Sequence, residues 1–420
     1  MFFIYDAALK VLSILLSPVW LIAFIIQPKF RAGFWEKSGF CPKNTNKKKS
    51  IWLHAVSVGE INATEGLIKE IKKNFPDYSL VVTTVTATGQ EVAKKKLAET
   101  ADIISYFPYD FDFSTNSAID NFNPALVIIA ETEIWPGFIK QANKREIPLL
   151  LVNGRISPNS FKGYRKLKFF FKKVLNKFSL ILMQTETDKD RITQIGAPTD
   201  ITEVMGNLKF DITNKLEKEK VETPKNELKI GNNKVLIAGS THQGEDEITL
   251  EAYKSLKQEF QDLKLLIAPR HPERNENVLN LIKNTGIKHG LRSLNNNFEE
   301  SDIIMLDTMG ELGKLYSISN IAFIGGSFSG TGGHNPLEPA IYGIPVISGP
   351  TVFNFKDIFK FMTSTDAAKI VKNQNELYEQ IKIYLINDDK YNKASRACLD
   401  IFEENKGATD FAIQKIKKFV

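Results

Sequence analysis

The sequence contains little cysteine and little histidine, which excludes several kinds of site. Only two of its 420 residues are cysteines, Cys41 and Cys398. They are too few for a disulfide framework or a structural zinc site. The five histidines show neither HxxxH nor HExxH spacing. We therefore expect a reducing environment, no cofactor and no bound metal.

The remaining argument for a metal is an acidic pair. Asp110 and Asp112 are spaced like the DxD motif of metal-dependent transferases. Such triplets are frequent in loops, and the surrounding run YFPYDFDF is rich in aromatic residues, which favours packing. We interpret the pair as structural.

The common nucleotide-binding loops are also absent. No GxxxxGK[ST] motif occurs, and the glycine-rich run GGSFSGTGG at 325–333 does not match GxGxxG with an acidic residue about twenty positions on. Kinase, ATPase and dehydrogenase functions therefore lose support. The run follows a predicted strand, so its backbone amides and the next helix start could hold a phosphate, or it could be a plain turn.

The chain has no large excess of one charge. Its formal net charge is +6, so charge alone does not imply a nucleic-acid partner, and we expect none. With 43% hydrophobic and 25% charged residues, the composition is that of a folded protein long enough for two domains.

One uncharged apolar run stands near the N-terminus, at 11–26, and predicts a membrane contact. A full span needs about 20 apolar residues, so whether the segment spans the membrane or lies in its surface stays open. No small-x-small site follows it, which argues against a cleaved signal peptide. The positive-inside tendency predicts that the body of the chain lies on the cytoplasmic face of the membrane, because these basic residues follow the run: Lys29, Arg31, Lys37, Lys43 and 47–49.

Short apolar runs rich in β-branched residues alternate with helical patterns in two series, which is typical of buried parallel strands. Two doubly wound, Rossmann-like α/β domains facing a cleft follow from this pattern, as in the GT-B glycosyltransferase fold, although two dehydrogenase-like domains would give the same pattern. The expected strands are 51–56, 80–86, 126–130, 148–152 and 180–184, then 235–239, 263–268, 303–306, 321–325 and 345–348.

A charged stretch poor in apolar residues separates the two series. We therefore predict four parts. They are an N-terminal membrane-anchoring helix at 1–30, a first domain at 31–213, a linker at 214–233 and a second domain at 234–420.

In the first half, carboxylates follow predicted strands. Glu60 comes at the opening of a helix after a Ser/Gly turn, where it could act as a general base or merely cap the helix. Glu131 and Glu133 end another strand, and we expect one of them to face the site.

In the second half, polar residues follow three strands. Arg270 could neutralise a phosphate that gains charge as it leaves, or it could be a surface residue beside a turn. Glu338 could bind ribose hydroxyls or stabilise a helix start, and Asn335 could contact phosphate or sugar. The segment 307–312 opens a further helix.

The stretch 161–178, FKGYRKLKFFFKKVLNKF, carries seven basic residues around three consecutive phenylalanines. It predicts a basic amphipathic helix on a membrane surface, or a solvated helix whose aromatic residues face the core.

Seven short motifs, in order along nearly the whole chain, together resemble the 3-deoxy-D-manno-octulosonic acid (Kdo) transferase family. The resemblance implies a GT-B fold, CMP-Kdo as donor, a lipid A precursor (lipid IVA) as acceptor, and an inverting, metal-independent transfer at the inner-membrane lipid surface in lipopolysaccharide synthesis. The motifs are HAVSVGE (54–60), ETEIWP (131–136), NGRIS (153–157), GNLKFD (206–211), APRHPER (268–274), DTMGEL (307–312) and GGHNPLEPA (332–340).

The resemblance also implies roles for individual residues. Glu60 matches the catalytic base of the family, and Glu131 and Lys209 match supports of the transition state. The contacts to CMP would come from Pro269, Arg270, Met309, Gly310, Glu311, Asn335, Pro336, Leu337 and Glu338. The rival functions are a nucleotide-sugar epimerase and a membrane-tethered binding protein.

Overall fold

The computed structural model describes residues 2–27, 31–46, 48–211, 228–294 and 298–420. The chain forms two compact units, one of residues 1–212 and 405–420, the other of residues 213–404. Most of the predicted linker, at 212–227, lies outside the described residues, as do 28–30 of the predicted anchor.

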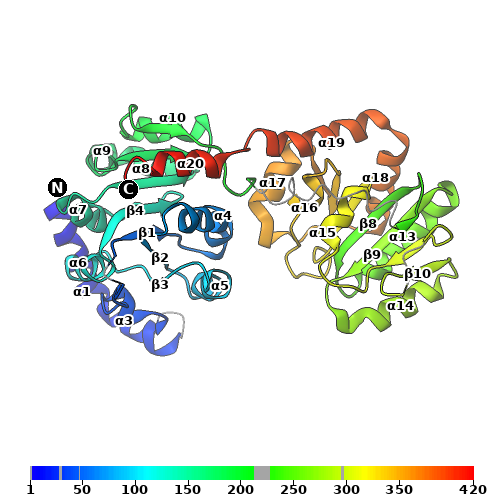
Figure 1. The fold of residues 1–420 in the computed structure, drawn as a ribbon, viewed down its shortest axis with the longest axis horizontal. Helices are drawn as coiled ribbons and strands as arrows, with labels where there is room; N and C mark the ends of the chain where they lie inside the picture. The colour runs from blue at the N-terminus through cyan, green and yellow to red at the C-terminus, as the bar shows by residue number, and fades with distance from the viewer. Residues whose placement is uncertain (1, 28–30, 47, 212–227, 295–297) are drawn as a thin grey trace. The chain divides into compact units, whose positions relative to one another are not determined.

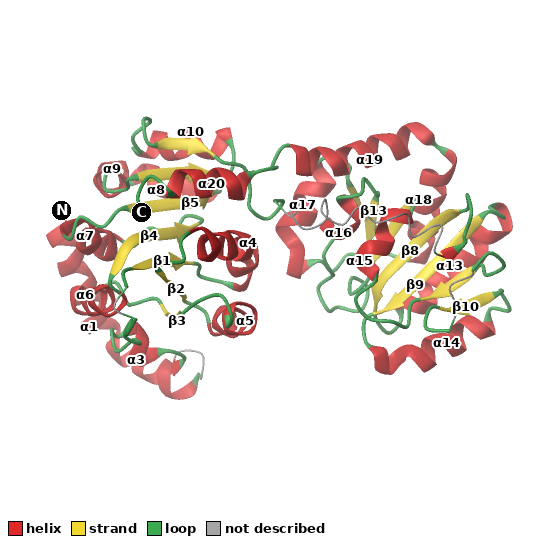
Figure 2. Cartoon of the chain, in the orientation of Figure 1, coloured by secondary structure: helices red, strands yellow, loops and turns green. Residues whose placement is uncertain are grey.

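The first unit is a seven-stranded parallel sheet in the order β3-β2-β1-β4-β5-β6-β7 (Figures 1 and 2). The order reverses between β1 and β4, the place where ligands of doubly wound sheets bind. The strands are β1 (Ser50–His54), β2 (Ser79–Thr84), β3 (Ile103–Tyr106), β4 (Pro124–Ala130), β5 (Leu149–Gly154), β6 (Leu180–Met183) and β7 (Thr202–Val204).

Helices bury both faces of this sheet, which is why its central strands are mostly apolar and almost entirely buried. Helices α4, α5 and α20 pack on one face, and α6, α7, α9 and α10 pack on the other. The helices are α1 (Phe2–Ile26), α3 (Phe34–Lys37), α4 (Val58–Asn74), α5 (Ala87–Leu97), α6 (Asp112–Phe122), α7 (Pro136–Lys144), α8 (Pro158–Lys166), α9 (Lys168–Leu175), α10 (Glu186–Ile195) and α20 (Ala408–Ile416).

The last helix returns to the first unit. Ala412, Ile413 and Ile416 of α20 are buried in the same core as Ile61 and Leu67 of α4. The sequence pattern places residues 405–420 in the second domain because it follows chain order, whereas the helix packs where its apolar face is covered.

The second unit is also a seven-stranded parallel sheet, in the order β10-β11-β9-β8-β12-β13-β14. Its order reverses between β8 and β12. The strands are β8 (Lys234–Thr241), β9 (Leu263–Pro269), β10 (His289–Leu291), β11 (Ile303–Met305), β12 (Ile321–Ile324), β13 (Val346–Ser348) and β14 (Ala368–Ile370).

Helices α13, α14, α18 and α19 bury one face of this sheet in a single core. The prediction of two doubly wound α/β domains is therefore confirmed. The helices are α13 (Glu245–Glu259), η1 (Pro272–Arg274), α14 (Asn275–Asn284), α15 (Leu312–Leu315), η2 (Tyr316–Ile318), α16 (Leu337–Ala340), η3 (Phe353–Phe355), α17 (Lys356–Ser364), α18 (Gln374–Ile386) and α19 (Asp388–Glu403).

The N-terminal apolar run forms part of α1, which contains Pro18. Among the described residues, no helix has the length and apolarity needed to cross a membrane. The first turns of α1 pack on the first unit, where Tyr5 donates to Asp110 (2.7 Å) and Lys140 pairs with Asp6 (2.6 Å).

Candidate active site

Glu60 stands at the reversal point of the first sheet, in the first turn of the helix that follows β1. The carboxylate accepts a hydrogen bond from the Val56 amide (2.6 Å) and another from the Ser57 hydroxyl (3.2 Å). Ser57 is the N-cap of α4, and its own side chain makes no cap bond. The Glu60 carboxylate instead holds the turn that enters α4, because it bonds the residue before the N-cap and the N-cap hydroxyl, and this is compatible with a position in the site.

The surroundings of the Glu60 carboxyl group favour its protonated form. Burial is the largest cause, and it raises the pKa to about 7. The Val56 hydrogen bond lowers the pKa, and the charges of Glu131 and Glu133 raise it. A carboxyl group with a pKa near neutral pH is suited to general acid–base chemistry.

Glu131 and Glu133 follow β4, the neighbour of β1 across the reversal point. Glu131 has a positive φ of 55°, and its carboxylate pairs with the Lys209 ammonium (3.2 Å). Burial and the charge of Glu131 raise the pKa of Glu133. The charges of both carboxylates raise the pKa of Glu60, whereas the sequence pattern predicts that one of the two faces the site.

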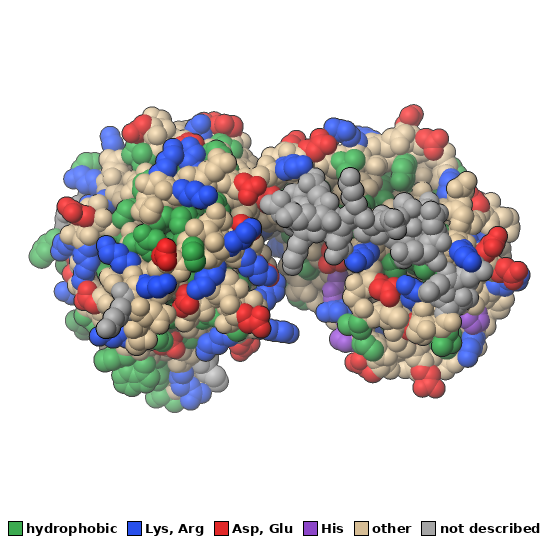
Figure 3. All heavy atoms as spheres, viewed as in Figure 1, with side chains coloured by type: hydrophobic (Ala, Val, Ile, Leu, Met, Phe, Trp, Pro, Cys, Tyr) green, Lys and Arg blue, Asp and Glu red, His purple; other side chains and the backbone are tan. Residues whose placement is uncertain are grey.

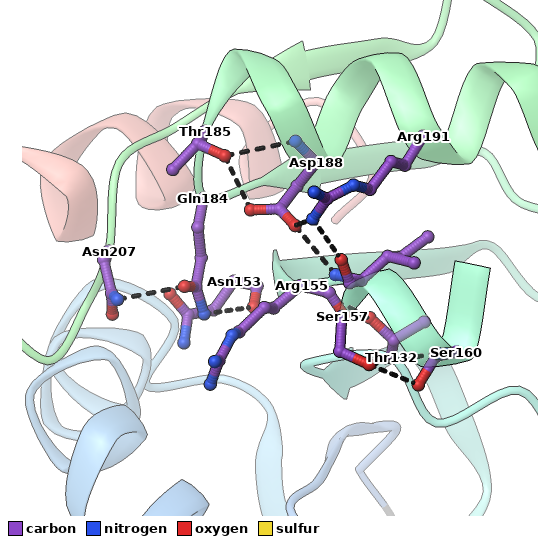
Figure 4. Close-up of polar contacts among 11 residues, drawn as sticks. Thr132, Asn153, Arg155, Ser157, Ser160, Gln184, Thr185, Asp188, Arg191 and Asn207 are labelled. Atoms are coloured by element: carbon purple, nitrogen blue, oxygen red, sulfur yellow. Dashed lines mark hydrogen bonds and ion pairs between the residues drawn. The ribbon is translucent and has the colours of Figure 1, made fainter. Parts of the chain in front are cut away.

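A chain of amide side chains holds the turn that carries Lys209 (Figure 4). Asn207 accepts from the Lys209 amide (2.9 Å) and donates to Gln184 (3.0 Å). Gln184 donates to the carbonyl of Asn153 (3.0 Å), and the Asn153 side chain accepts from the Leu208 amide (3.0 Å). The ion pair with Glu131 therefore rests on a rigid support.

The sequence pattern does not assign this support to the site. Asn153 and Asn207 belong to two of the short motifs, but their role depends on contacts between β5, β6 and a turn far along the chain. The sequence offers one signal for this support, the polar side chain of Gln184 at the end of a predicted apolar strand.

The loops that follow β4 and β5 are tied together beside this support. The Thr132 hydroxyl bonds both the amide (3.0 Å) and the carbonyl (2.5 Å) of Arg155. Asp188 accepts from the Ile156 amide (2.8 Å) and from Thr185 (2.6 Å), and Figure 4 shows this second group of bonds next to the first. Arg155 therefore stands on a fixed backbone at the same sheet edge as Glu131.

In the second unit, the glycine-rich loop after β12 is organised differently from the prediction. Its amides at Gly326, Ser327 and Phe328 each donate to the buried carboxylate of Glu245 (2.7 Å each). Glu245 also accepts from the His242 amide (2.8 Å). These three loop amides are therefore occupied by an internal carboxylate, so a phosphate at this loop would need its other amides or the next helix start.

Arg270 and Glu338 lie close enough for their charges to interact. Arg270 follows β9, and its amide donates to the Thr241 carbonyl (3.0 Å). Burial raises the pKa of Glu338, and Asn335 and Arg270 lower it. Asn335 approaches the Glu338 carboxylate at 3.5 Å and caps the Leu337 amide (3.1 Å).

The other residues assigned to the donor stand at the same sheet edge, at the ends of β9, β11 and β12. Pro269 ends β9, and Pro336 precedes the buried Leu337 at the start of α16. Met309 is exposed, Gly310 has a φ of 86°, and the Glu311 carboxylate is engaged by Arg292 (2.7 Å).

The acidic pair of the first unit serves packing. Asp110 accepts from the amides of Gly137 (2.8 Å) and Phe138 (2.6 Å) at the start of α7. Asp112 bonds Lys140 (2.7 Å) and Gln141 (2.6 Å). Both carboxylates are thus engaged by neighbouring groups, as the structural interpretation requires.

Known proteins resemble the chain over most of its length. A family model described as 3-Deoxy-D-manno-octulosonic-acid transferase (kdotransferase) matches residues 32–212. A 3-deoxy-D-manno-octulosonic acid transferase of Haemophilus influenzae is 34% identical over 401 residues, 94% of this chain and 92% of that protein. A transferase of the same name from Rickettsia felis is 35% identical over 373 residues, 88% of this chain and 79% of that protein.

A solved structure shares the fold. UDP-GlcNAc 2-epimerase from Neisseria meningitidis, bound to UDP-GlcNAc, matches with a TM-score of 0.53 over 88% of this chain and 100% of that chain. Because the two sequences are only 15% identical, this likeness concerns the fold alone.

The raised pKa of Glu60 predicts how stability depends on pH. Between the ordinary carboxyl value of 4.5 and about 7, the unfolded chain loses a proton that the folded chain keeps. The free energy of unfolding should therefore fall as pH rises through this window, and Glu60→Gln should remove that fall. Relative to the parent, the variant should gain about 2 to 3 kcal/mol between pH 5 and pH 8.

Denaturation followed by tryptophan fluorescence measures this, because all four tryptophans stand before residue 212 and report the first unit. Glu91→Gln, at an exposed position of α5, is the matched control and should follow the parent. Equal pH dependence of Glu60→Gln and the parent would show that the carboxyl titrates normally.

Proposed function

The chain belongs to the 3-deoxy-D-manno-octulosonic acid (Kdo) transferase family and is a glycosyltransferase, and we propose that it transfers Kdo from CMP-Kdo to a lipid A precursor with inversion and without a metal. The observation that carries the proposal is Glu60, with a pKa near 7, at the reversal point of the first sheet beside the Glu131–Lys209 pair.

Glu60 is proposed as the general base. Its carboxylate takes the proton of an acceptor sugar hydroxyl while the hydroxyl oxygen bonds to the anomeric C2 of Kdo. The bond from C2 to the phosphate oxygen breaks, and CMP leaves with the electron pair. Attack opposite the leaving group in one step inverts the anomeric centre.

Lys209 and Glu131 are proposed to support the transition state. The amide chain from Asn153 to Asn207 fixes the Lys209 backbone, and Glu131 orients its ammonium at 3.2 Å. A fixed cation of this kind stabilises developing negative charge without reorganising during the reaction.

Arg270 and Glu338 are proposed to hold the nucleotide. The leaving CMP is a phosphate monoester, which a guanidinium can stabilise without a divalent ion or a general acid. The Glu338 carboxylate beside Asn335 suits ribose hydroxyls. Pro269, Met309, Gly310, Pro336 and Leu337 would complete the surroundings of the nucleotide, with Glu311 held by Arg292.

We also propose that the first unit binds a lipid surface at the cytoplasmic face of the bacterial inner membrane. Exposed apolar side chains on α1 include Leu12, Leu15 and Ile25. Phe24 of α1 contacts Phe34, whose neighbour Trp35 is exposed (ring centroids 5.1 Å and 5.3 Å). In Figure 3, hydrophobic side chains gather over the region of α1 and α3.

The basic stretch 161–178 joins this surface. It forms two helices, α8 and α9, instead of one, and Phe170 packs on Tyr5 of α1 (5.8 Å). Leu167 and Phe169 remain exposed among lysines, while Val174 and Phe178 are buried in the core. One face of the stretch is therefore buried in the core, and the exposed face is the one proposed to meet the membrane. Exposed apolar groups ringed by lysines suit an anionic lipid surface.

Transfer itself is tested with purified protein, CMP-Kdo and a lipid A precursor. The parent should transfer Kdo in the presence of excess EDTA, with a rate that rises with pH through about 7 as Glu60 ionises. Glu60→Gln should lower kcat roughly 10²- to 10⁴-fold and leave CMP binding unchanged. Normal turnover of the variant would reduce Glu60 to a helix cap. Consumption of a UDP-sugar without acceptor would favour an epimerase.

Arg270 and Glu338 should contribute differently to the reaction. Arg270→Ala or Glu338→Ala should each raise the CMP dissociation constant roughly ten- to a hundredfold, because a charge-assisted hydrogen bond is lost. Arg270→Ala should also lower kcat, whereas Glu338→Ala should mainly raise KM. Calorimetry and kinetics measure this, with Glu379→Ala, at an exposed position of α18, as control. Parental CMP binding by both variants would place the nucleotide elsewhere.

Vesicle binding tests the membrane surface. The double variant Leu12→Asp with Leu15→Asp should lower sedimentation with phosphatidylglycerol vesicles at least about tenfold, since each leucine loses its apolar contact. Ile386→Asp, at an exposed position in the second unit, should bind like the parent. Equal binding by all three proteins would contradict the assignment of this surface.

A further inference from the structure

Three histidines of the second unit stand at the edge where its sheet order reverses. His242 follows β8, His271 follows β9, and His334 follows the glycine-rich loop after β12. Since β9, β8 and β12 are neighbours in the sheet, their carboxyl ends bring the rings together. Figure 3 shows histidine side chains at the surface of this unit. Neither the base nor the nucleotide contacts proposed above use them.

His242 and His334 form a pair. Their Nε2 atoms lie 2.9 Å apart, and the rings are stacked at 15° with centroids 5.2 Å apart. His271 meets His242 edge to face at 5.3 Å. One Nε2 of the pair must carry a hydrogen and the other a lone pair, so the neutral pair shares one proton between the rings.

The surrounding loop is built to hold this pair. Glu245 fixes both sides of it, because the carboxylate binds the His242 amide and the loop amides from Gly326 to Phe328. The His334 amide donates to the Gly325 carbonyl (3.2 Å). Burying a carboxylate costs free energy unless hydrogen bonds compensate for the lost water, and here four amides do so. Because one amide belongs to His242 and three belong to the loop before His334, Glu245 holds the two rings at the reversal point.

The charges around the pair favour an anion. The charged and titratable groups that act on the two rings are Glu245 on α13, Arg270 and His271 after β9, and Arg274 in η1. Glu245 is bound by four amides, Arg274 is paired with the buried Asp246, and the exposed Glu273 carboxylate lies 3.6 Å from the His271 Nδ1. Burial, His242 and Arg270 together lower the pKa of His334 to about 4, so the free pair is neutral at pH 7.

The order of the groups indicates which anion. Glu338 interacts with Arg270, and Arg270 interacts with both rings of the pair. In the proposed donor site, Glu338 binds the ribose and Arg270 binds the phosphate. The histidine pair comes next in this order, where the sugar would lie. The sugar carbon bonded to that phosphate is C2 of the ulosonic acid, which carries the carboxylate of the donor.

We propose that the His242–His334 pair, supported by His271, binds the carboxylate of the donor's ulosonic acid and takes up one proton from solvent as it does so. The inference rests on the proposed function and adds the residues that distinguish a carboxylate-bearing sugar from a neutral one. With the added proton, both outer Nδ1 atoms become donors while the shared proton stays between the rings. The carboxylate compensates the new positive charge.

The pair is observed directly by NMR of ¹³C-labelled histidine, because the chain has only five imidazoles. In protein saturated with CMP, free Kdo should move the His242 and His334 signals toward imidazolium shifts, and the C1 methyl ester of Kdo should not. His289, which stands on β10 with Nδ1 at the Ile287 carbonyl (3.0 Å), is the internal control. Equal shifts from Kdo and its ester, or the full shift with CMP alone, would overturn the inference.

Kinetics give an independent measure. His334→Gln and His242→Gln should raise KM for CMP-Kdo roughly ten- to a hundredfold, while the CMP dissociation constant stays within about twofold, since the nucleotide contacts are intact. His289→Gln should match the parent. Unchanged KM in both variants would refute the pair as a carboxylate site even if transfer proceeds. Absent transfer by the parent would instead refute the proposed function, and the NMR result with free Kdo would still stand.

Discussion

Burial of a carboxyl group at the edge of the first sheet is the constraint on which that unit's site depends. Burial raises the pKa of Glu60 more than any other cause, and the charges of Glu131 and Glu133 also raise it, so Glu60 can hold a proton near neutral pH. Lys209 pairs with Glu131. The amide chain through Gln184 therefore matters for Glu60 as well, because it keeps this cation in place beside Glu131.

The second unit handles buried charge in the opposite way. Glu245 is fully buried, and its carboxylate accepts hydrogen bonds from four amides that fix the conformation of the glycine-rich loop. Arg270 and the histidine pair remain at this sheet edge as the groups proposed to bind the donor. The first unit thus carries an excess of acid at its reversal point, whereas the second carries cationic and donor groups, which suit the stabilisation of an anionic leaving group.

All ten strands expected from apolar runs are present, and the four missed ones, β3, β7, β10 and β14, are the outermost strands of the two sheets. Edge strands are short and partly exposed, so they lack the continuous apolar run that marks a buried strand. Glu60, Arg270 and Glu338 were predictable because each follows a strand within a short motif. The Glu245 cradle and the histidine pair were not, since they join segments about 80 to 90 residues apart through contacts that no local pattern records.

The return of the chain to the first unit makes the order of synthesis matter. Helix α20 covers the apolar face of α4, whose first turn carries Glu60, and α20 follows the whole second unit in the chain. Although N-terminal domains generally fold first, this one is left open along α4 until the entire second unit has been made. A nascent or prematurely terminated chain that lacks α20 would therefore expose apolar side chains of α4 to chaperones and proteases, and the helix that carries Glu60 would gain this packing partner only after the second unit has been synthesised.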